Sequence, residues 1–170
     1  MSSSCFAPIA APNATILILG SLPGTLSLER KQYYAHPRNN FWPFMQHLMN
    51  IPATAPYEER THRLKQRGIA LWDVCATADR PGSLDSRIAE ATILTNDFAH
   101  FLATHPQLTL IAFNGAKAHQ IFQRRVLPNL PLPARNIPRA VLPSTSPANA
   151  SIPLARKLQL WQEALLGKAI

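Results

Sequence analysis

The amino-acid sequence predicts an α/β protein with three layers, α/β/α, in which helices cover both faces of a central four-stranded, mostly parallel sheet. Four short apolar runs predict the sheet, because strands buried on both faces are apolar at consecutive positions. Amphipathic segments separate these runs, and such alternation is typical of parallel β-α-β units. The length of 170 residues fits one domain, and we expect a single domain over residues 1–170.

The expected strands and helices alternate along the chain. The apolar runs predict strands at residues 15–19, 69–74, 108–113 and 140–142. Amphipathic patterns predict helices at residues 40–50, 57–66, 86–104, 115–125 and 153–166. Open α/β sheets bind ligands beyond the carboxyl ends of their strands, so the segments that follow the four strands are the candidates for function.

Composition and charge narrow the function classes. The 17 Lys and Arg against 9 Asp and Glu give a formal charge of +8, which favours a polyanionic partner such as nucleic acid without deciding it. Cys5 and Cys75 are far apart and no histidine has metal-ligand spacing, so we expect no metal, no cofactor and no disulfide framework. The sequence shows neither a signal peptide nor a membrane span, and we expect a cytoplasmic monomer, associated with the nucleoid in a prokaryote.

Two glycines and a proline follow the first strand directly. In Gly20-Ser21-Leu22-Pro23-Gly24 they allow backbone amides to approach a ligand closely, although an ordinary turn after a strand is the alternative. Neither GK[ST] nor GxGxxG is present, so nucleoside-triphosphate and dinucleotide sites have no motif support.

The segment YYAHPRNNFW at residues 33–42 gathers four aromatic, two amide and two basic side chains. Such a set suits a base extruded from DNA, because rings stack on the base, amides pair with its edge and basic groups approach phosphates. Tyr34 lies in a loop and is the candidate stacking residue. Phe41 and Trp42 begin an apolar helix, where core packing is the better interpretation.

Together these motifs resemble the uracil-DNA glycosylase superfamily. GSLPG and YYAHPRNNFW are similar to the GINPG and AHPxNxFW elements of its mismatch-specific uracil glycosylases. GIALWDVCATADRPGSLD, Phe113-Asn114-Gly115 and LPSTSPAN resemble further motifs of the thymine-DNA glycosylase group, so the resemblance covers roughly residues 15–160. The hypoxanthine-DNA glycosylase family has the most similar pattern, because its first motif also reads GSLPG without Asn or Asp.

The resemblance implies that Asn39 positions the attacking water. Mismatch-specific enzymes use the Asn of GINPG, and the matching residue here is Leu22, which has no hydrogen-bonding side chain. A neutral amide suffices, because the glycosidic bond breaks through an oxocarbenium-like sugar, and backbone amides of residues 20–24 can stabilise the departing base. The alternative for Asn39 is a cap residue before Phe41, and Asn40 competes for either role.

Two residues at strand ends are candidates to read the base edge. An ionised Asp73 can accept from N1–H of hypoxanthine while a backbone N–H serves O6; a helix cap or a salt bridge to Arg80 is the alternative. Asn114 can read a base edge or cap the helix that begins at Gly115. The expected base-binding residues are Gly20, Ser21, Leu22, Pro23, Tyr34, Asp73 and Asn114.

Short hydroxyl side chains follow the last strand. They leave backbone N–H groups accessible to phosphate, and the helix start at Pro153 adds a favourable dipole; a surface turn is the alternative. In related families this loop wedges into the base stack with Leu or Arg, and the matching residue here is the small Ala148. The expected DNA-binding residues are Ser144, Thr145, Ser146, Ala148 and Asn149.

The sequence thus predicts a metal-free, monofunctional base-excision glycosylase that acts on damaged DNA, hydrolyses deoxyinosine and releases hypoxanthine. Lyase activity is not expected, because neither Lys31 nor Lys117 has a sequence setting that argues for a lysine that forms a Schiff base. Two alternatives stay open. One is a uracil or mismatch (G·U or G·T) glycosylase, and the other is a non-catalytic DNA or nucleotide binder with the same fold.

Overall fold

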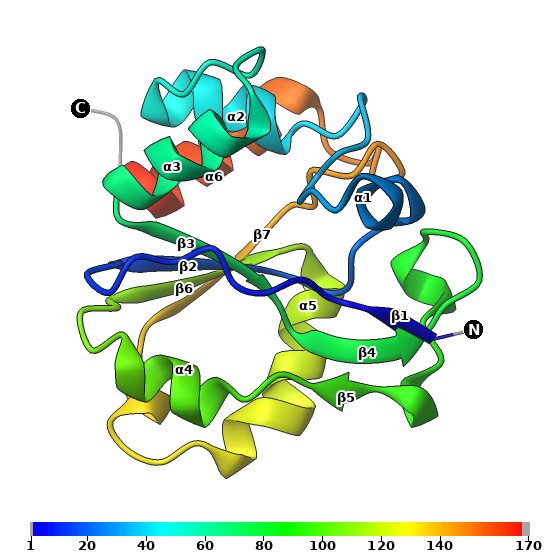
Figure 1. Ribbon diagram of the computed structural model, residues 1–170, viewed down its shortest axis with the longest axis vertical. Helices are drawn as coiled ribbons and strands as arrows, with labels where there is room; N and C mark the ends of the chain where they lie inside the picture. Colours follow the sequence, from blue (N-terminus) through cyan, green and yellow to red (C-terminus); the bar gives the residue numbers. More distant parts are fainter. Residues whose placement is uncertain (1, 168–170) are drawn as a thin grey trace.

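A four-stranded parallel sheet lies at the centre of the structure, a computed structural model that describes residues 2–167 (Figure 1). Its strands, in the order β3-β2-β6-β7, are β2 (Ile16–Gly20), β3 (Ile69–Asp73), β6 (Leu110–Asn114) and β7 (Arg139–Leu142), and all neighbours are parallel. The four predicted strands are confirmed to within two residues at either end. Residues 1 and 168–170 of the expected 1–170 domain lie outside the described residues.

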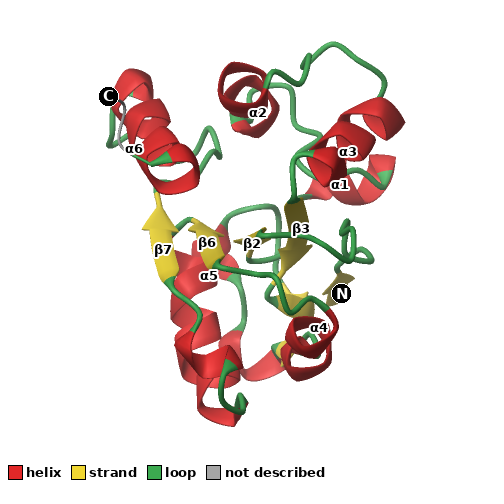
Figure 2. Ribbon diagram, turned by 90° about the vertical axis from the view of Figure 1, so that its left-hand side faces the viewer, coloured by secondary structure: helices red, strands yellow, loops and turns green. Residues whose placement is uncertain are grey.

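Helices cover both faces of this sheet, which confirms the three-layer prediction (Figure 2). One face carries α2 (Phe41–Met49), α3 (Tyr57–Gln66) and α6 (Leu154–Leu166). The other face carries α4 (Phe98–Thr104) and α5 (Ala116–Ile121). The helix of α5 continues as a wider π-helical turn over Phe122–Val126, so the predicted helix 115–125 is present in two forms.

Consecutive residues of β2 belong to two separate hydrophobic clusters, one on each face of the sheet. Leu17 and Leu19 pack on the side of Phe122, whereas Ile18 packs on the side of Trp161, and all of them are buried. Since side chains alternate across a strand, a strand covered on both faces must be apolar throughout. The uninterrupted apolar run that predicted this strand therefore has its explanation in the two layers of helices.

The predicted helix over residues 86–104 is wrong for its first two thirds. Only α4 forms, and Asp97 caps it by accepting a hydrogen bond from His100 N–H at 3.1 Å. Upstream, the Thr92 hydroxyl accepts from Asp79 N–H at 2.8 Å and the Asn96 side chain donates to the Asp73 carbonyl at 2.7 Å. Side chains that bond to the backbone in this way compete with helix formation.

Two features have no counterpart among the predicted elements. A small antiparallel sheet, in the order β1-β4-β5, contains β1 (Ser2–Ser4), β4 (Cys75–Asp79) and β5 (Leu94–Thr95). A short helix, α1 (Thr25–Arg30), follows the GSLPG segment. No helix within residues 2–167 is both long and apolar enough to cross a membrane.

Candidate functional site

The predicted site residues meet at the carboxyl edge of the main sheet. Gly20 at the end of β2 pairs in register with Asp73 at the end of β3, and Asn114 at the end of β6 pairs with Leu142. The loops that follow these strands run to the right-hand side of Figure 1, around α1. This is the edge at which open parallel sheets bind ligands.

The Asp73 carboxyl and the Tyr34 hydroxyl converge beside Gly20. A β-carbon on Gly20 would lie 2.5 Å from Asp73 Oδ1 and 3.2 Å from the Tyr34 hydroxyl oxygen, so glycine is needed to leave room for the carboxyl group. Among residues 2–167, the buried Asp73 Oδ2 and Tyr34 hydroxyl have no hydrogen-bond partner. An unsatisfied buried polar group costs about 1–3 kcal/mol, so a ligand that supplies partners here gains affinity.

The electrostatic environment of Asp73 favours its protonated form. Burial raises the pKa of this carboxyl to about 7; the negative charge of Asp85 acts in the same direction and the positive charge of Arg80 opposes it. Burial also raises the pKa of the Tyr34 phenol, the charge of Asp73 adds to this rise, and the Asn114 side chain opposes it. Asp73, Tyr34 and Asn114 therefore form one interacting group.

Tyr34 is held by its backbone and by its ring. Its φ of 57° lies in the left-handed region, which is uncommon for a bulky residue and favours a functional or packing reason for the conformation. Its ring stacks on Phe41, with centroids 4.2 Å apart and planes inclined by 27°. Phe41 is fully buried, which agrees with its interpretation as a core residue.

Asn39 contacts the start of α2 through its side chain, one position before the cap residue Asn40, whose own side chain makes no capping hydrogen bond. Asn39 Oδ1 accepts a hydrogen bond from N–H of Phe41, the first helical residue, at 2.9 Å. Asn40 N–H donates to the Thr145 carbonyl at 3.0 Å and thereby ties this segment to the loop after β7. Both side chains are half-buried, so either amide can reach a ligand at the edge of the sheet.

Asn114 is bound reciprocally to Thr145. Its Nδ2 donates to Thr145 Oγ1 at 2.9 Å and its Oδ1 accepts from Thr145 N–H at 2.9 Å. The helix-capping alternative for Asn114 is therefore wrong, because the helix after Gly115 receives no side-chain cap. Thr145 is fully buried, so its expected contact with DNA is corrected: its hydroxyl is used inside the fold.

The rest of the loop after β7 stays accessible. Ser144, Ser146 and Asn149 are half-buried, and Ala148 is exposed. Ser146 N–H donates to Ser144 Oγ at 3.1 Å and Ala148 N–H to Ser146 Oγ at 3.3 Å, so the serine hydroxyls shape the loop. The ammonium of Lys157 in α6 donates to the Asn149 carbonyl and anchors the far end of the loop.

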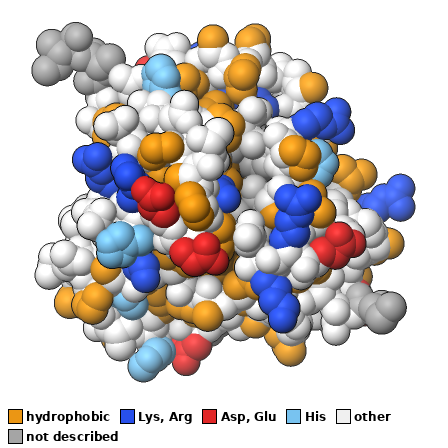
Figure 3. All heavy atoms as spheres, turned by 45° about the horizontal axis from the view of Figure 1, so that its top comes forward, with side chains coloured by type: hydrophobic (Ala, Val, Ile, Leu, Met, Phe, Trp, Pro, Cys, Tyr) orange, Lys and Arg blue, Asp and Glu red, His pale blue; other side chains and the backbone are white. Residues whose placement is uncertain are grey.

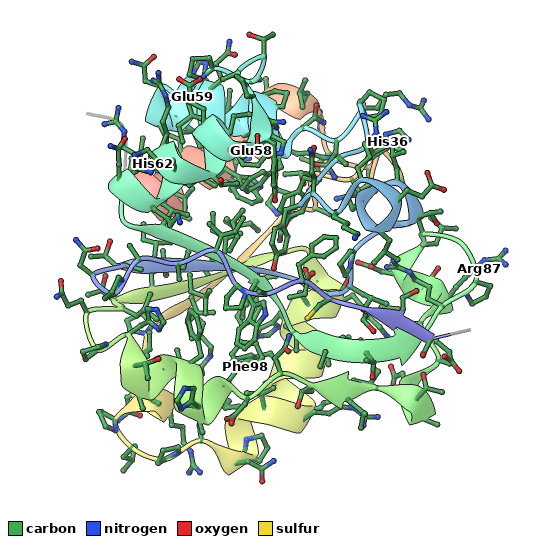
Figure 4. The ribbon with its side chains drawn as sticks, viewed as in Figure 1. His36, Glu58, Glu59, His62, Arg87 and Phe98 are labelled. Atoms are coloured by element: carbon green, nitrogen blue, oxygen red, sulfur yellow. The ribbon has the colours of Figure 1, made fainter. Side chains whose placement is uncertain are left out.

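Exposed basic side chains lie around the same edge. Figure 4 shows His36 and Arg87 on the side to which the strand-end loops run. Figure 3 shows Lys and Arg side chains on both halves of its face. Four exposed basic residues come from α1 and from the segments that follow α1 and β4: Arg30, Lys31, Arg38 and Arg87. Residues 2–167 contain no group of three or more His, Cys, Asp or Glu side chains placed to hold a metal ion.

Comparison with known families identifies the superfamily of this chain. The family model described as "Uracil DNA glycosylase superfamily" matches residues 7–165, nearly the whole chain. The chain belongs to this superfamily. The resemblance drawn from the motifs is thus confirmed, and the carboxyl edge of the sheet is the candidate active site of a superfamily member.

Two relatives of this superfamily member are named hypoxanthine DNA glycosylase. One, from Methanosarcina acetivorans, is 39% identical over 134 residues, which are 73% of this chain and 83% of the relative. The other, from Methanosarcina barkeri, is 38% identical over 119 residues, which are 69% and 74% of the two chains. The solution structure of a candidate uracil DNA glycosylase from Methanosarcina acetivorans superimposes with a TM-score of 0.78 at 35% identity and covers 94% of both chains.

Sequence reasoning missed Asp85 and considered Arg80 only as a possible partner of Asp73. Arg80 is buried, and its NH1 group lies 3.2 Å from Asp85 Oδ1. The salt-bridge alternative for Asp73 is therefore wrong, since the ionic partner of Arg80 is Asp85. The only available signal was the position of both residues in the segment after the second predicted strand.

Proposed function

We propose that this chain is a monofunctional DNA-deoxyinosine glycosylase, which hydrolyses the N-glycosidic bond of deoxyinosine in DNA and releases hypoxanthine. The observation that carries the proposal is the pair of buried groups without partners, the Asp73 carboxyl and the Tyr34 hydroxyl, at the carboxyl edge of the sheet. The two relatives named hypoxanthine DNA glycosylase support the choice of substrate.

The Asp73 carboxyl matches the edge of hypoxanthine. This base has N1–H as a donor beside O6 as an acceptor, so an ionised Asp73 accepts from N1–H while a backbone N–H serves O6. The Tyr34 hydroxyl lies close to the same carboxyl. Adenine has an acceptor at N1, which would face the carboxylate without a proton, so the arrangement favours the deaminated base.

Tyr34 also supplies a stacking surface. A planar ring has two faces, and Phe41 covers one of them at a centroid distance of 4.2 Å. The proposal places the extruded base against the second face, so that base, Tyr34 and Phe41 form a continuous stack. Base-aromatic stacking contributes about 1–3 kcal/mol per base.

In the proposed mechanism, water is the nucleophile and backbone N–H groups stabilise the departing base. Water oxygen bonds to C1′ of the sugar while the C1′–N9 bond breaks; the bonding electrons stay with hypoxanthine, which also takes up the proton that water loses. Asn39 Oδ1 already accepts from Phe41 N–H, and its second lone pair can orient the water. The amides of Ser21, Leu22 and Gly24 have no acceptor among residues 2–167 and can stabilise charge on the departing base.

The DNA backbone is proposed to lie across the accessible loop and the basic side chains. Ser144, Ser146 and Asn149 approach phosphates, and the exposed Ala148 stands where related enzymes insert a wedge. The exposed Arg38 and Arg87 supply positive charge. The proposed scheme uses groups of one chain and no metal, so the proposal is a metal-free monomer.

An alkali-cleavage assay on defined oligonucleotides tests the function. Purified protein should make the strand alkali-sensitive at deoxyinosine, and Asn39→Ala should lower the single-turnover rate by about 100-fold or more through loss of water orientation. Asn39→Asp keeps an acceptor for Phe41 N–H and should fold normally. If Asn40→Ala loses the rate and Asn39→Ala keeps it, the water belongs to Asn40.

The same assay separates the alternatives. Uracil also presents N3–H beside a carbonyl, so the pair of Asp73 and Tyr34 does not by itself exclude it. Substrates with deoxyuridine or a G·T mismatch are therefore run in parallel. Cleavage confined to deoxyuridine would refute the hypoxanthine assignment, and cleavage of no substrate would leave a non-catalytic DNA binder.

A further inference from the structure

The loop after β4 grips the GSLPG segment at three points. The Arg80 guanidinium donates to the carbonyl of Leu22 at 3.3 Å and to the carbonyl of Pro23. Asp85 Oδ1 accepts from the Ser21 hydroxyl at 2.6 Å. Ser83 Oγ also accepts from Thr25 N–H at 2.9 Å, so four of the five residues after β2 are hydrogen-bonded from one side.

Arg80 is an unusual choice for a purely structural contact. Its side chain is 1% exposed, and its Nε has no hydrogen-bond partner among residues 2–167. Removing a charge from water is costly, and replacing buried ion pairs by apolar residues is often neutral or stabilising. An apolar residue could supply neither the hydrogen bonds that shape the loop nor the positive charge beside it.

The bound carbonyls fix the direction of a free amide. In a trans peptide the C=O and N–H of the same unit point in opposite directions. The Pro23–Gly24 peptide is trans, so the grip of Arg80 on the Pro23 carbonyl turns Gly24 N–H away from the guanidinium. Hydrogen bonds to the carbonyl also polarise the peptide and make its N–H a stronger donor.

We propose that Arg80 is a positioning residue for base release: it holds the Ser21–Gly24 backbone so that its free amides face the departing base, and it places a positive charge behind them. Asp85 orients the guanidinium and ties it to Ser21. This inference rests on the proposed function, because the departing base is hypoxanthine in that scheme.

The same two residues act on Asp73 in opposite directions. The charge of Arg80 lowers the pKa of the Asp73 carboxyl, whereas the charge of Asp85 raises it. Other titratable groups that interact with this carboxyl are neutral at pH 7, and their own pKa values are raised by burial and by Asp73: Cys5, Tyr33, Tyr34 and Cys75. Changes at Arg80 and Asp85 should therefore move the titration of Asp73 in opposite directions.

Single-turnover kinetics on a deoxyinosine duplex, measured over a range of pH with enzyme in excess, test the proposal. The rate should rise with pH as Asp73 ionises, which gives the pH profile an ascending limb. Arg80→Met should lower the rate by about 100-fold with DNA affinity nearly unchanged, and should move this limb to higher pH. Asp85→Asn should move the limb to lower pH. Arg80→Lys keeps the charge, so its limb should stay near that of the wild type while the rate falls less.

The matched control is Arg63→Met, which removes an exposed arginine on α3 that pairs with Glu59 far from the site. A folded Arg80→Met variant with the wild-type rate and pH profile overturns the proposal, as does a loss confined to DNA affinity. Should Arg80→Met fail to fold, an unchanged rate in Arg80→Lys together with an unmoved limb in Asp85→Asn overturns it.

A measurement on the free protein separates this inference from the proposed function. NMR of uniformly labelled protein follows the Asp73 carboxyl carbon through its titration and the amide signals of Ser21, Leu22 and Gly24. Opposite shifts of the Asp73 pKa in Arg80→Met and Asp85→Asn, with displaced loop amides in the former, support Arg80 as positioning residue even without activity on deoxyinosine. Unmoved amides and an unmoved titration contradict it.

Discussion

In the proposed scheme, the choice of base depends on Asp73. Its carboxyl is 4% exposed, has an oxygen without a partner, and shares its surroundings with the Tyr34 hydroxyl. Burial raises its pKa to about 7, so the ionised and neutral forms are both populated at neutral pH. A base that donates N1–H stabilises the ionised form, which links recognition of hypoxanthine to pH.

The first prediction at the residue scale is a rise of the single-turnover rate with pH through about 7. Only the ionised Asp73 carboxylate carries no proton of its own, so only this form accepts a hydrogen bond from N1–H through either oxygen. Asp73→Asn should flatten this rise, since an amide accepts and donates without titrating. Asp73→Leu, which retains bulk but has no acceptor, should lose activity. A wild-type rate that falls above pH 7 would mean that the protonated carboxyl is the active form.

The same substitution carries a stability prediction. The pKa of Asp73 is raised in the folded protein above its ordinary value of 3.8, so the folded state binds this proton more tightly than the unfolded state. The contribution of this group to the free energy of unfolding is therefore lost as pH rises from about 4 through about 7. Asp73→Asn should raise Tm at pH 8, and much less at pH 5, in calorimetric scans; equal shifts at both pH values would contradict the burial of the charge.

The sequence identified residues at strand ends better than it identified their contacts. Gly20, Asp73 and Asn114 were predictable as neighbours, because the carboxyl ends of parallel strands meet at one edge. The contact of Arg80 with Pro23 was not, since it joins residues 57 positions apart through two loops whose paths no local pattern encodes. The same holds for Asn114, whose partner Thr145 lies 31 positions away.

At the scale of elements, hydrogen bonds between the end of β6 and the loop after β7 hold these two segments of the candidate site together. Asn114 and Thr145 exchange two hydrogen bonds in a fully buried setting, and Thr145 also receives Asn40 N–H on its carbonyl. Three segments that approach the substrate in the proposed scheme are thereby joined at one residue. In the proposed scheme, this fixed inner part supports the accessible residues of the loop that approach phosphates.

Thr145→Val tests that role. The variant keeps the shape and the backbone bonds of Thr145 but leaves the buried Asn114 Nδ2 without an acceptor, which should cost about 1–3 kcal/mol. For a protein of this size each kcal/mol lowers Tm by about 2–4 °C. Thr145→Ser restores the hydroxyl and serves as control, and a Thr145→Val variant with the Tm of the wild type would show that the bond does not matter.

The elements predicted wrongly share a physical cause. Residues 86–97 contain apolar side chains at spacings that suit a helix, and Ile88 and Ile93 are indeed buried. Their neighbours Thr92 and Asn96, however, bond to backbone groups of residues 73–79, and this favours short turns beside the small sheet. The main strands were predictable because burial on both faces leaves an unbroken apolar run.

At the scale of the whole molecule, the structure shows where some of the basic side chains behind the formal charge of +8 lie. Arg30 ends α1, Lys31 and Arg38 lie in the loop that follows it, and Arg87 lies on the side of Figure 4 to which the strand-end loops run; all four are exposed. Composition alone favoured a polyanion without deciding it. In the proposed scheme, basic side chains near the site contact the phosphates of DNA.

Affinity for undamaged duplex should therefore fall steeply with salt. Each phosphate contact contributes a slope of about −0.9 to the plot of log K against log salt concentration. The double substitution Arg38→Gln and Arg87→Gln should reduce the magnitude of the slope by about two, whereas Arg63→Gln on α3 should leave it unchanged. A flat salt response of the wild type, measured by fluorescence anisotropy, would count against DNA as the partner.

The proposed function has this superfamily member hydrolyse deoxyinosine at the edge formed by Asp73, Tyr34 and Asn39. Chromatographic measurement of free base after a single turnover is its most direct test. The predicted result is one hypoxanthine released per deoxyinosine, from a strand that remains intact until alkali is added. Absence of free hypoxanthine, or strand scission before alkali treatment, would refute the proposed monofunctional glycosylase.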